Sequence, residues 1–241
     1  MDNGCVVGVA GGSGGVGASV LVAALGVRAV TAGRTAVCVD GQRLGGGLDV
    51  TLGLEQERGL RWPDLAGVRG QVDGRELLRR LPAGDGLAVL SFDRSSDVTP
   101  TGEAVRAVLS ALAAVVELVV VDLPRPDEPL FEPFTGAVDA VVLLGGPGVR
   151  QLAALSAVAP QVGRRCDEVW LALRGAGRDR QLADVTAGAL DLPLLALVPD
   201  DPALEAHLLH GTPPGSSARS VVAGAADAIL LQLLVAHRVA S

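Results

Sequence analysis

Lysine is absent from this 241-residue chain, whose twenty cationic side chains are all arginine. Tyrosine is absent too, and three phenylalanines and two tryptophans are its only aromatic residues. The core must then be built from valine, leucine and alanine, which suits a covered parallel sheet, because its strands are continuous apolar runs. Without lysine or tyrosine, and with its three histidines late in the chain, the sequence also disfavours a nicotinamide-dependent oxidoreductase.

Basic clusters are missing as well. The net charge is −7, and arginines adjoin one another only at Arg79-Arg80 and Arg164-Arg165. Nucleic acids and anionic membrane surfaces attract clustered Lys and Arg, so we expect no specific nucleic-acid partner and no stable membrane anchor. The apolar segment from about 219 to 238 has too thin a polar face for an interfacial helix, and we interpret it as a helix that closes the core.

Cysteine is limited to Cys5, Cys38 and Cys166, an odd number at wide spacing. Two of the three lie within apolar runs, which predicts buried, reduced thiols rather than a disulfide or a metal site. No charged leader precedes an apolar segment at the N-terminus, and no apolar run is long enough to span a bilayer. These features predict a cytoplasmic protein.

A glycine-rich turn follows the first apolar run, residues 5–10, and precedes an Ala/Leu/Val-rich stretch typical of a helix. A strand, a glycine-rich turn and a helix in this order predict a loop whose backbone N–H groups and helix dipole bind phosphate. We expect the phosphate site to consist of Gly12, Ser13, Gly14, Gly15, Val16, Gly17, Ala18 and Ser19. Ala18 occupies the position at which a P-loop places its lysine, so a methyl group replaces a charge.

The same loop also satisfies the Rossmann pattern G-x-G-x-x-G, and Asp40 follows at about the distance expected of a ribose-binding acid. The first forty residues therefore leave a Rossmann-type dinucleotide site open. A later apolar run, residues 118–122, ends in Asp122, as a Walker-B strand does when its carboxylate holds Mg²⁺ opposite the P-loop Ser/Thr. A lone Asp here would be a helix cap or a solvated strand end, but together with the loop and Ser19 it favours a P-loop nucleotide site.

Apolar runs alternate with helix-like segments along the chain, which predicts a mainly parallel α/β sheet with right-handed crossovers. We expect one P-loop NTPase-type domain, residues 1–241, with helices on both faces of the sheet. The expected strands are 5–10, 36–40, 87–92, 118–122, 140–144, 168–173 and 194–199. The expected helices are 18–32, 74–81, 100–115, 149–162, 179–189, 201–209 and about 219–238. The Gly/Pro/Arg-rich segments 41–47, 124–133 and 211–217 are expected to be loops at the rim of the site.

Five segments together resemble a known family. They are Gly-Gly-Val-Gly-Ala-Ser at 14–19, Val-Asp-Gly-Gln at 39–42, Gly-Gly-Leu-Asp-Val-Thr-Leu-Gly-Leu-Glu at 46–55, Val-Val-Val-Asp-Leu-Pro-Arg at 119–125 and Leu-Pro-Leu-Leu-Ala-Leu-Val-Pro-Asp at 192–200. On these segments nearly the whole chain resembles the MinD/ParA superfamily, and within it the actinobacterial CpaE-like, septum-site-determining (Ssd-type) proteins of Tad pilus or secretion loci. The resemblance implies ATP and Mg²⁺ as ligands, a homodimer, and pilus, secretion or division proteins as partners.

The resemblance also implies roles for single residues. It makes Ser19 and Asp122 ligands of Mg²⁺ and Asp40 the switch carboxylate, a candidate third ligand. It assigns Pro199 and Asp200 to the loop that closes over the base.

The chain departs from the family's pattern at four positions. The signature lysine would stand at Ser13 and the ordinary P-loop lysine at Ala18, and both are absent. Gln42 stands where a second Asp is frequent, and Leu173 where an Asn contacts adenine. We expect a positioning or assembly protein with weak ATP binding and little hydrolysis. The alternative is a pseudo-ATPase scaffold that never binds nucleotide, and a Rossmann-type dinucleotide-binding protein ranks last.

Overall fold

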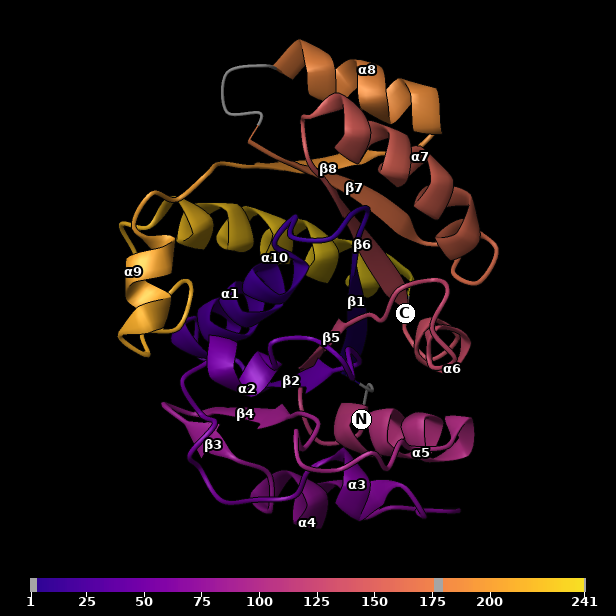
Figure 1. Ribbon diagram of the computed structural model, residues 1–241, viewed down its shortest axis with the longest axis vertical. Helices are drawn as coiled ribbons and strands as arrows, with labels where there is room; N and C mark the ends of the chain where they lie inside the picture. The colour runs from indigo at the N-terminus through magenta and orange to yellow at the C-terminus, as the bar shows by residue number, and fades with distance from the viewer. Residues whose placement is uncertain (1–3, 176–179, 241) are drawn as a thin grey trace.

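A computed structural model describes residues 4–175 and 180–240, in which eight strands form one sheet through the middle of the molecule (Figure 1). The strand order is β3-β4-β2-β5-β1-β6-β7-β8. Every neighbouring pair is parallel except β3 and β4, which pair antiparallel at one edge. The predicted mainly parallel α/β sheet is therefore confirmed.

The predicted strands agree with the observed ones to within two residues at either end, and only the two-residue β3 was not predicted. The strands are β1 Cys5–Gly11, β2 Ala36–Asp40, β3 Ala83–Gly84, β4 Leu87–Leu90, β5 Leu118–Asp122, β6 Ala140–Gly145, β7 Val169–Arg174 and β8 Leu194–Val198. Continuous apolar runs located these strands well because most of their residues are buried on both faces of the sheet.

The seven predicted helices are present, although α9 begins three residues later than expected. They are α1 Ala18–Thr31, α4 Gly74–Arg79, α5 Gly102–Ala113, α7 Val149–Gly163, α8 Arg180–Leu190, α9 Leu204–Leu209 and α10 Val221–Ala240. The predicted start of α8, Asp179, lies outside the described residues. Three further helices were not predicted, namely α2 Leu48–Thr51, α3 Trp62–Leu65 and α6 Phe131–Thr135. Each has only four or five residues, too few for a helical period to show in the sequence. Because α6 starts at Phe131, the prediction of a loop over 124–133 is wrong at its end.

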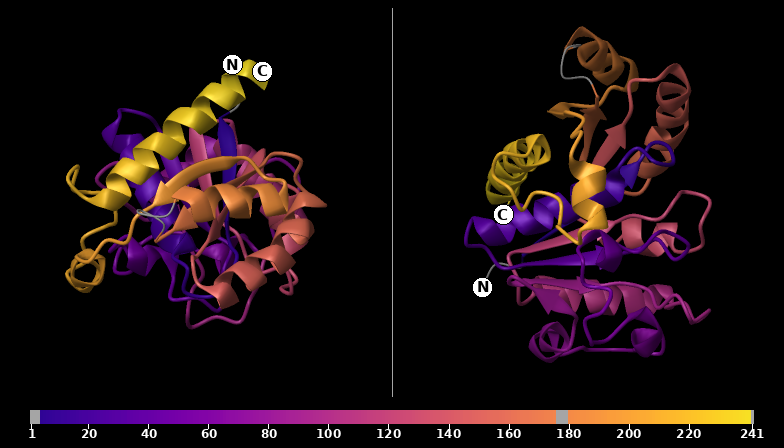
Figure 2. Two further views of the ribbon diagram at one scale, coloured as in Figure 1. Left: turned by 90° about the horizontal axis from the view of Figure 1, so that it is seen from above. Right: turned by 60° about the vertical axis from the view of Figure 1, so that its left-hand side comes forward.

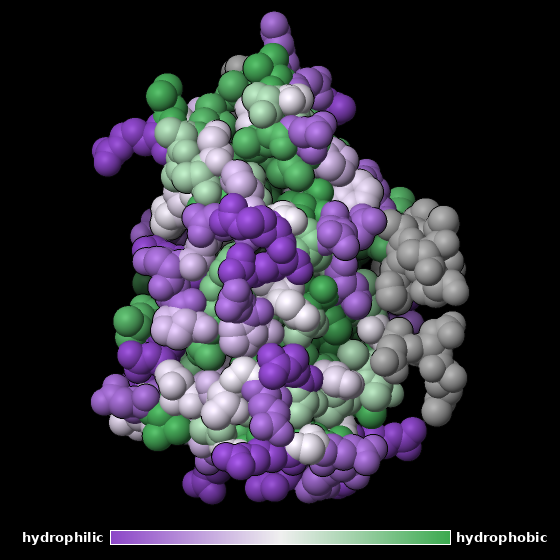
Figure 3. Space-filling view, turned by 90° about the vertical axis from the view of Figure 1, so that its right-hand side faces the viewer, coloured by the Kyte–Doolittle hydropathy of each residue, from purple (hydrophilic) through white to green (hydrophobic). Residues whose placement is uncertain are grey.

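Helices cover both faces of the sheet, each over its own hydrophobic cluster. One cluster unites the sheet with α1, α2 and α10, and Figure 2 shows α10 lying along α1. The other unites the opposite face with α3 to α8. On that side of the molecule, hydrophobic residues gather at the upper end and hydrophilic ones dominate the middle (Figure 3). The covered sheet with helices on both faces is confirmed.

Three predictions about buried or apolar segments can be compared with the structure. All three cysteines are free and buried, as expected. Val222, Ile229 and Leu233 on α10 are buried against α1 and the sheet, so the described part of this helix does close the core. Among the described residues, no helix has the length and apolar character needed to cross a membrane.

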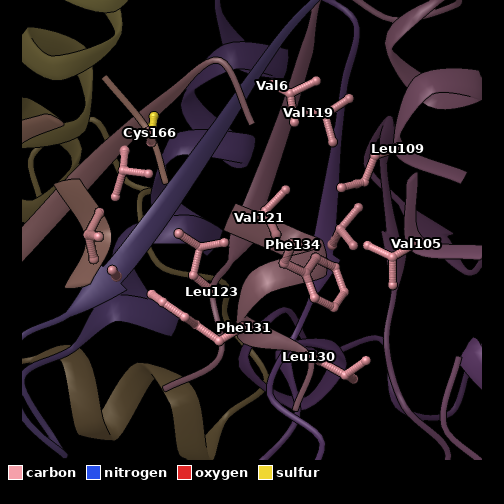
Figure 4. Packing of buried hydrophobic residues seen from close by; sticks show 14 of the residues in the cluster. Val6, Val105, Leu109, Val119, Val121, Leu123, Leu130, Phe131, Phe134 and Cys166 are labelled. Atoms are coloured by element: carbon pink, nitrogen blue, oxygen red, sulfur yellow. The ribbon is translucent and has the colours of Figure 1, made fainter. Parts of the chain in front are cut away.

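Most of the few aromatic rings gather beside the ends of β2 and β5. Trp62 lies 5.6 Å from Phe134 in an edge-on contact and 6.1 Å from Phe92, measured between ring centroids. Phe134 lies close to Val121 of β5 and Val105 of α5 in the core (Figure 4). The Trp62 indole Nε1 also donates a hydrogen bond to the Asp40 carbonyl oxygen at 2.7 Å. The aromatic cluster therefore fixes the end of β2, where the candidate switch carboxylate stands.

Replacing Trp62 with Phe should keep a ring in the cluster but remove the indole donor to the Asp40 carbonyl. Leaving a buried polar group without its partner costs about 1–3 kcal/mol, so we expect the free energy of unfolding in urea to fall by that amount. Trp170→Phe is the matched control, because Trp170 is partly exposed and its indole makes no hydrogen bond within the described chain. Equal losses in the two variants would contradict a specific role for the Trp62 hydrogen bond.

Candidate nucleotide site

A cavity of about 710 Å³ lies at the carboxyl ends of β1, β2 and β5. Its lining includes all eight residues of the predicted phosphate loop, Gly12 to Ser19, together with Asp40 and Asp122. Parts of 45–48 and 122–127 form its rim, as expected for the loops after β2 and β5. Segment 211–217 instead contributes to a separate cavity beside α1 and the β3–β4 turn, so it is not a rim of this site.

The backbone of the loop is a row of unpaired N–H groups. From Ser13 to Ser19, no N–H group donates a hydrogen bond to another described residue. The loop turns into α1 through Gly17, whose φ of +101° is costly for any residue with a side chain. Successive free N–H groups at the start of a 14-residue helix form a concavity that binds anions. The loop therefore has the backbone features of a phosphate cradle without its lysine.

Ser19 and Asp122 meet beside this cradle. The Ser19 hydroxyl donates to Asp122 Oδ2 at 2.5 Å, joining the start of α1 to the end of β5. Asp122 is 1% exposed, and its other oxygen, Oδ1, has no hydrogen-bond partner among the described residues. Burial raises the pKa of Asp122 to about 7, with a further contribution from the nearby Asp40 carboxylate. The structure thus offers one unpaired carboxylate oxygen at the phosphate loop.

Asp40 stands beside Asp122 because the two residues pair across β2 and β5. Its Oδ1 accepts from the Gln42 N–H and its Oδ2 from the Leu48 N–H, both at 2.9 Å. Burial raises the pKa of Asp40 to about 6, although the two N–H donors oppose that shift. Asp40 therefore fixes the path of the loop after β2, and its part in binding a metal stays a prediction.

Gln42 connects the loop after β2 to the loop after β5. Its Nε2 donates to the Leu123 carbonyl oxygen at 3.0 Å, and the residue lines the cavity. An amide here keeps the two loops together without adding a negative charge. The resemblance implies a second Asp at this position, but Gln42 stands there and bridges the two loops.

The helix α2 beyond this loop is held by two ion pairs of a buried carboxylate. The Asp49 carboxylate, 2% exposed, lies 2.8 Å from the Arg94 Nη2 and 3.4 Å from the Arg61 Nη2. Arg43, which the sequence places beside the site, pairs with Asp97 at 3.5 Å and does not line the cavity. The pairs with Arg94 and Asp97 connect segment 42–51 to the chain after β4, and the pair with Arg61 connects it to the start of α3. No local pattern in the sequence predicts these connections.

Arg174 at the end of β7 braces the phosphate loop, and sequence reasoning missed it. Its Nη1 donates to the carbonyl oxygens of Gly15 and Val16, at 3.3 and 3.1 Å. Its Nε donates to the Asp200 carboxylate at 2.8 Å. The loop is therefore linked to the chain after β8 through one guanidinium. One signal could have identified Arg174: it ends β7, a strand parallel to β1 and separated from it in the sheet by one strand, β6.

The residues assigned to base recognition lie apart from the main cavity. Leu173 is fully buried in the core and lines neither this cavity nor its neighbour. Pro199 lines a small adjoining pocket of about 40 Å³ next to Arg174 and Leu204. Asp200 is engaged by Arg174. The structure thus brings the loop, Asp40 and Asp122 together and leaves Pro199 and Asp200 beside them.

A magnesium ion fits the chemistry of the Ser19–Asp122 pair. Within the described residues, no group of three or more His, Cys, Asp or Glu side chains could hold a metal alone. Mg²⁺ is commonly bound through one or two carboxylates plus substrate phosphates and water, so such a cluster is not required. The unpaired Oδ1 of Asp122 and the Ser19 hydroxyl are the oxygens available for it.

The raised pKa values of Asp122 and Asp40 give stability a definite pH dependence. Between about pH 4 and 7 these two carboxyls bind more protons in the folded chain than in the unfolded chain, so their contribution to stability falls as the pH rises through that window. Asp122→Asn removes one of the two buried charges. In EDTA we expect it to raise the melting temperature by about 3 °C or more at pH 8, with little change at pH 5.

Asp127→Asn is the control, since Asp127 is an exposed carboxylate at the rim of the same cavity. Its melting temperature should follow that of the unaltered chain at both pH values. If Asp122→Asn behaved in the same way, Asp122 would not be the group that carries the pH dependence.

Comparison with known proteins gives relatives in one genus and structural neighbours in several. No protein-family model matches the chain. Two curated Mycobacterium tuberculosis proteins, MT3760 and Rv3660c, both described as uncharacterised, are 36% identical to it over 227 residues. The match covers 94% of this chain and 63% of either relative, so the chain spans less than two thirds of their length.

The structural neighbours are more distant in sequence. A ParA family ATPase from Chlorobium tepidum superposes with a TM-score of 0.83 at 17% identity, covering 95% of this chain and 99% of the other. The septum site-determining protein MinD from Pyrococcus horikoshii, solved with Mg-ADP, gives 0.78 at 20% identity and 95% coverage of both chains. The MinC:MinD complex from Aquifex aeolicus gives 0.78 at 18% identity, covering 95% of this chain and 96% of that one. The chain therefore has the fold of the MinD/ParA ATPases.

Proposed function

We propose that the chain is a positioning or assembly protein of the MinD/ParA type, which binds Mg²⁺-ATP weakly and hydrolyses it little. The observation that carries the proposal is the Ser19–Asp122 pair, with one unpaired carboxylate oxygen, beside a loop of free N–H groups. A buried carboxylate oxygen without a donor is unfavourable by itself, and a cation would satisfy it.

The binding chemistry follows from the groups that are present. The loop N–H groups would hold phosphate oxygens, while Ser19 and Asp122 would hold the metal. Mg²⁺ would neutralise part of the phosphate charge, which matters more here because Ala18 supplies none. Losing one charge-assisted contact costs about 1.5–3 kcal/mol, or about ten- to a hundredfold in affinity. A site that was micromolar with lysine would still be occupied at millimolar ATP.

Hydrolysis would suffer more than binding. Phosphoryl transfer depends on positioning and on stabilising the charge of the transition state, and cationic groups supply much of that stabilisation. The chain has Ser13 and Ala18 at the two positions where the resemblance places lysines. An ATP-dependent conformational or assembly role with slow turnover agrees with these losses better than a fast ATPase does.

The wider role rests on the relatives and on the sequence resemblance. The MinD structures came from a complex with MinC and from a complex with Mg-ADP, which supports a protein partner and a nucleotide for this chain as well. The resemblance to CpaE-like, Ssd-type proteins narrows the proposed partners to septum, Tad pilus or secretion proteins. We propose that the protein acts in the cytoplasm.

We also propose a homodimer that forms through the face around the cavity. Three exposed apolar side chains lie at this edge of the sheet, namely Leu44 at 82%, Val98 at 51% and Val149 at 85% exposure. The Arg43–Asp97 pair links the loops that carry Leu44 and Val98. Because Ser13 cannot supply a charge to a partner's phosphates, the dimer should depend little on ATP.

A scaffold that never binds nucleotide is the second candidate, and one observation favours it. Position 173, where the resemblance places an Asn, holds a leucine whose side chain is buried in the core, so no side-chain amide is available here to contact a base. The ligand-binding and scaffold proposals differ in one measurable property, the heat of ATP binding.

Calorimetry with ATP tests the proposal directly. We expect binding that requires Mg²⁺ and is about ten- to a hundredfold weaker than in a lysine-bearing relative. In Mg²⁺, Ser19→Ala should bind ATP about as weakly as the unaltered chain does in EDTA, because a ligand of the metal is lost. Ser156 lies on the exposed face of α7, so Ser156→Ala should bind ATP as the unaltered chain does. An absence of heat at millimolar ATP would leave the scaffold as the remaining candidate.

Sedimentation tests the dimer. We expect a dimer with and without ATP, and Val149→Asp should shift the equilibrium toward monomer by placing a charge in the apolar face. Val185→Asp is the control, because Val185 is similarly exposed, at 62%, but lies on α8. A monomer that dimerises only when ATP is added would contradict the nucleotide-independent interface.

A further inference from the structure

The phosphate loop lacks a lysine, but among the described residues two arginine side chains line its cavity. They are Arg125, in the loop after β5, and Arg174, at the end of β7. Three carboxylates of the described chain, Asp40, Asp122 and Asp127, line the same cavity. A polyphosphate entering this site would meet more negative than positive side chains from the described residues, so the contribution of each arginine matters.

Arg174 is already engaged by the protein. Asp200 pairs with its Nε, and the Gly15 and Val16 carbonyl oxygens accept from its Nη1. In an anion-binding loop the carbonyl groups point away from the concavity that the N–H groups line. Arg174 therefore supports the loop through its carbonyl groups, with its charge balanced by Asp200, and acts as a positioning residue.

Arg125 approaches the loop at Gly14 and has no such partner among the described residues. A side-chain carbon at Gly14 would lie 3.0 Å from the Arg125 Nη2, so the guanidinium rests against the loop itself. No carboxylate in the described part of the chain forms an ion pair with Arg125. Of the two arginines in the cavity, Arg125 is the one whose charge remains available.

The backbone at Arg125 is held in place while its side chain stays exposed. Pro124 and Pro126 flank it, and proline rings restrict the backbone on both sides. The Glu128 carboxylate accepts from the Arg125 N–H at 3.4 Å. Asp122 lies only three residues earlier, so the end of β5 carries the candidate metal ligand and the loop directly after it carries Arg125. This arrangement limits the cost of ordering Arg125 on a ligand.

We propose that Arg125 contacts the terminal phosphates of a polyphosphate bound in the loop and supplies the positive charge that Ser13 and Ala18 lack. A guanidinium offers a planar pair of donors that matches two phosphate oxygens, so it can serve here from outside the loop. This inference rests on the proposed nucleotide site and extends it to a residue at which the P-loop pattern requires no cation.

The test compares four chains by calorimetry in Mg²⁺, using ATP, ADP and inorganic tripolyphosphate as ligands. They are the unaltered chain, Arg125→Ala, Arg106→Ala and the double variant Arg125→Ala/Ala18→Lys. Arg106 is the matched control, an exposed arginine on α5 without an ion pair in the described structure. Thermal melts of all four show whether each variant is folded.

Arg125→Ala should weaken ATP and tripolyphosphate binding about ten- to a hundredfold and ADP binding less, because the contact is to the terminal phosphates. Arg106→Ala should bind normally, and Ala18→Lys should restore binding to Arg125→Ala. If the unaltered chain binds ATP and Arg125→Ala binds it equally well, the role of Arg125 is wrong while the nucleotide site stands. If the unaltered chain binds tripolyphosphate through Arg125 but not ATP, the nucleotide proposal fails alone. Binding of no ligand by the unaltered chain overturns both.

Discussion

Two buried carboxylates side by side, Asp40 and Asp122, are the constraint around which this site is organised. Parallel pairing of β2 with β5 brings them into register, and burial raises both pKa values, with the Asp40 carboxylate adding to the rise at Asp122. Two backbone N–H groups donate to the Asp40 carboxylate and offset the cost of its burial, whereas Asp122 accepts from the Ser19 hydroxyl and its Oδ1 has no hydrogen-bond partner among the described residues. The unequal satisfaction of the pair assigns them different roles, since one carboxylate holds a loop and the other keeps an oxygen available for a cation.

Several contacts restrain the segments around the Asp40–Asp122 pair. Trp62 fixes the backbone at Asp40, Gln42 connects the loops after β2 and β5, and the Asp49 ion pairs anchor α2. Arg174 holds the phosphate loop to the chain after β8. These contacts are long-range in sequence. Those of Trp62, Gln42 and Asp49 position segments that surround the cavity, whereas those of Arg174 reach the lysine-free loop itself.

The sequence predicted the sheet well and the short elements poorly, for one physical reason. Strands such as β5 are apolar on both faces because helices cover both, so their bounds follow from composition alone. Helices α2, α3 and α6 are too short to show a period, and they are held by contacts that arise only on folding, such as the edge-on Trp62–Phe134 contact and the Asp49–Arg94 pair. Leu48 N–H, at the start of α2, is held by a carboxylate eight residues away in the chain.

The sequence by itself determined the parallel sheet, the phosphate loop and the absence of its lysines, because these depend on local runs and on residue identity. Only the tertiary structure decided which side chains surround the loop. It turned Leu173 into the core, engaged Arg174 with Asp200, and left the Arg125 side chain against Gly14 without an ion pair to any described residue. Spacing along the chain carries no information on these distances, because crossovers bring the ends of separate parallel strands to one edge of the sheet.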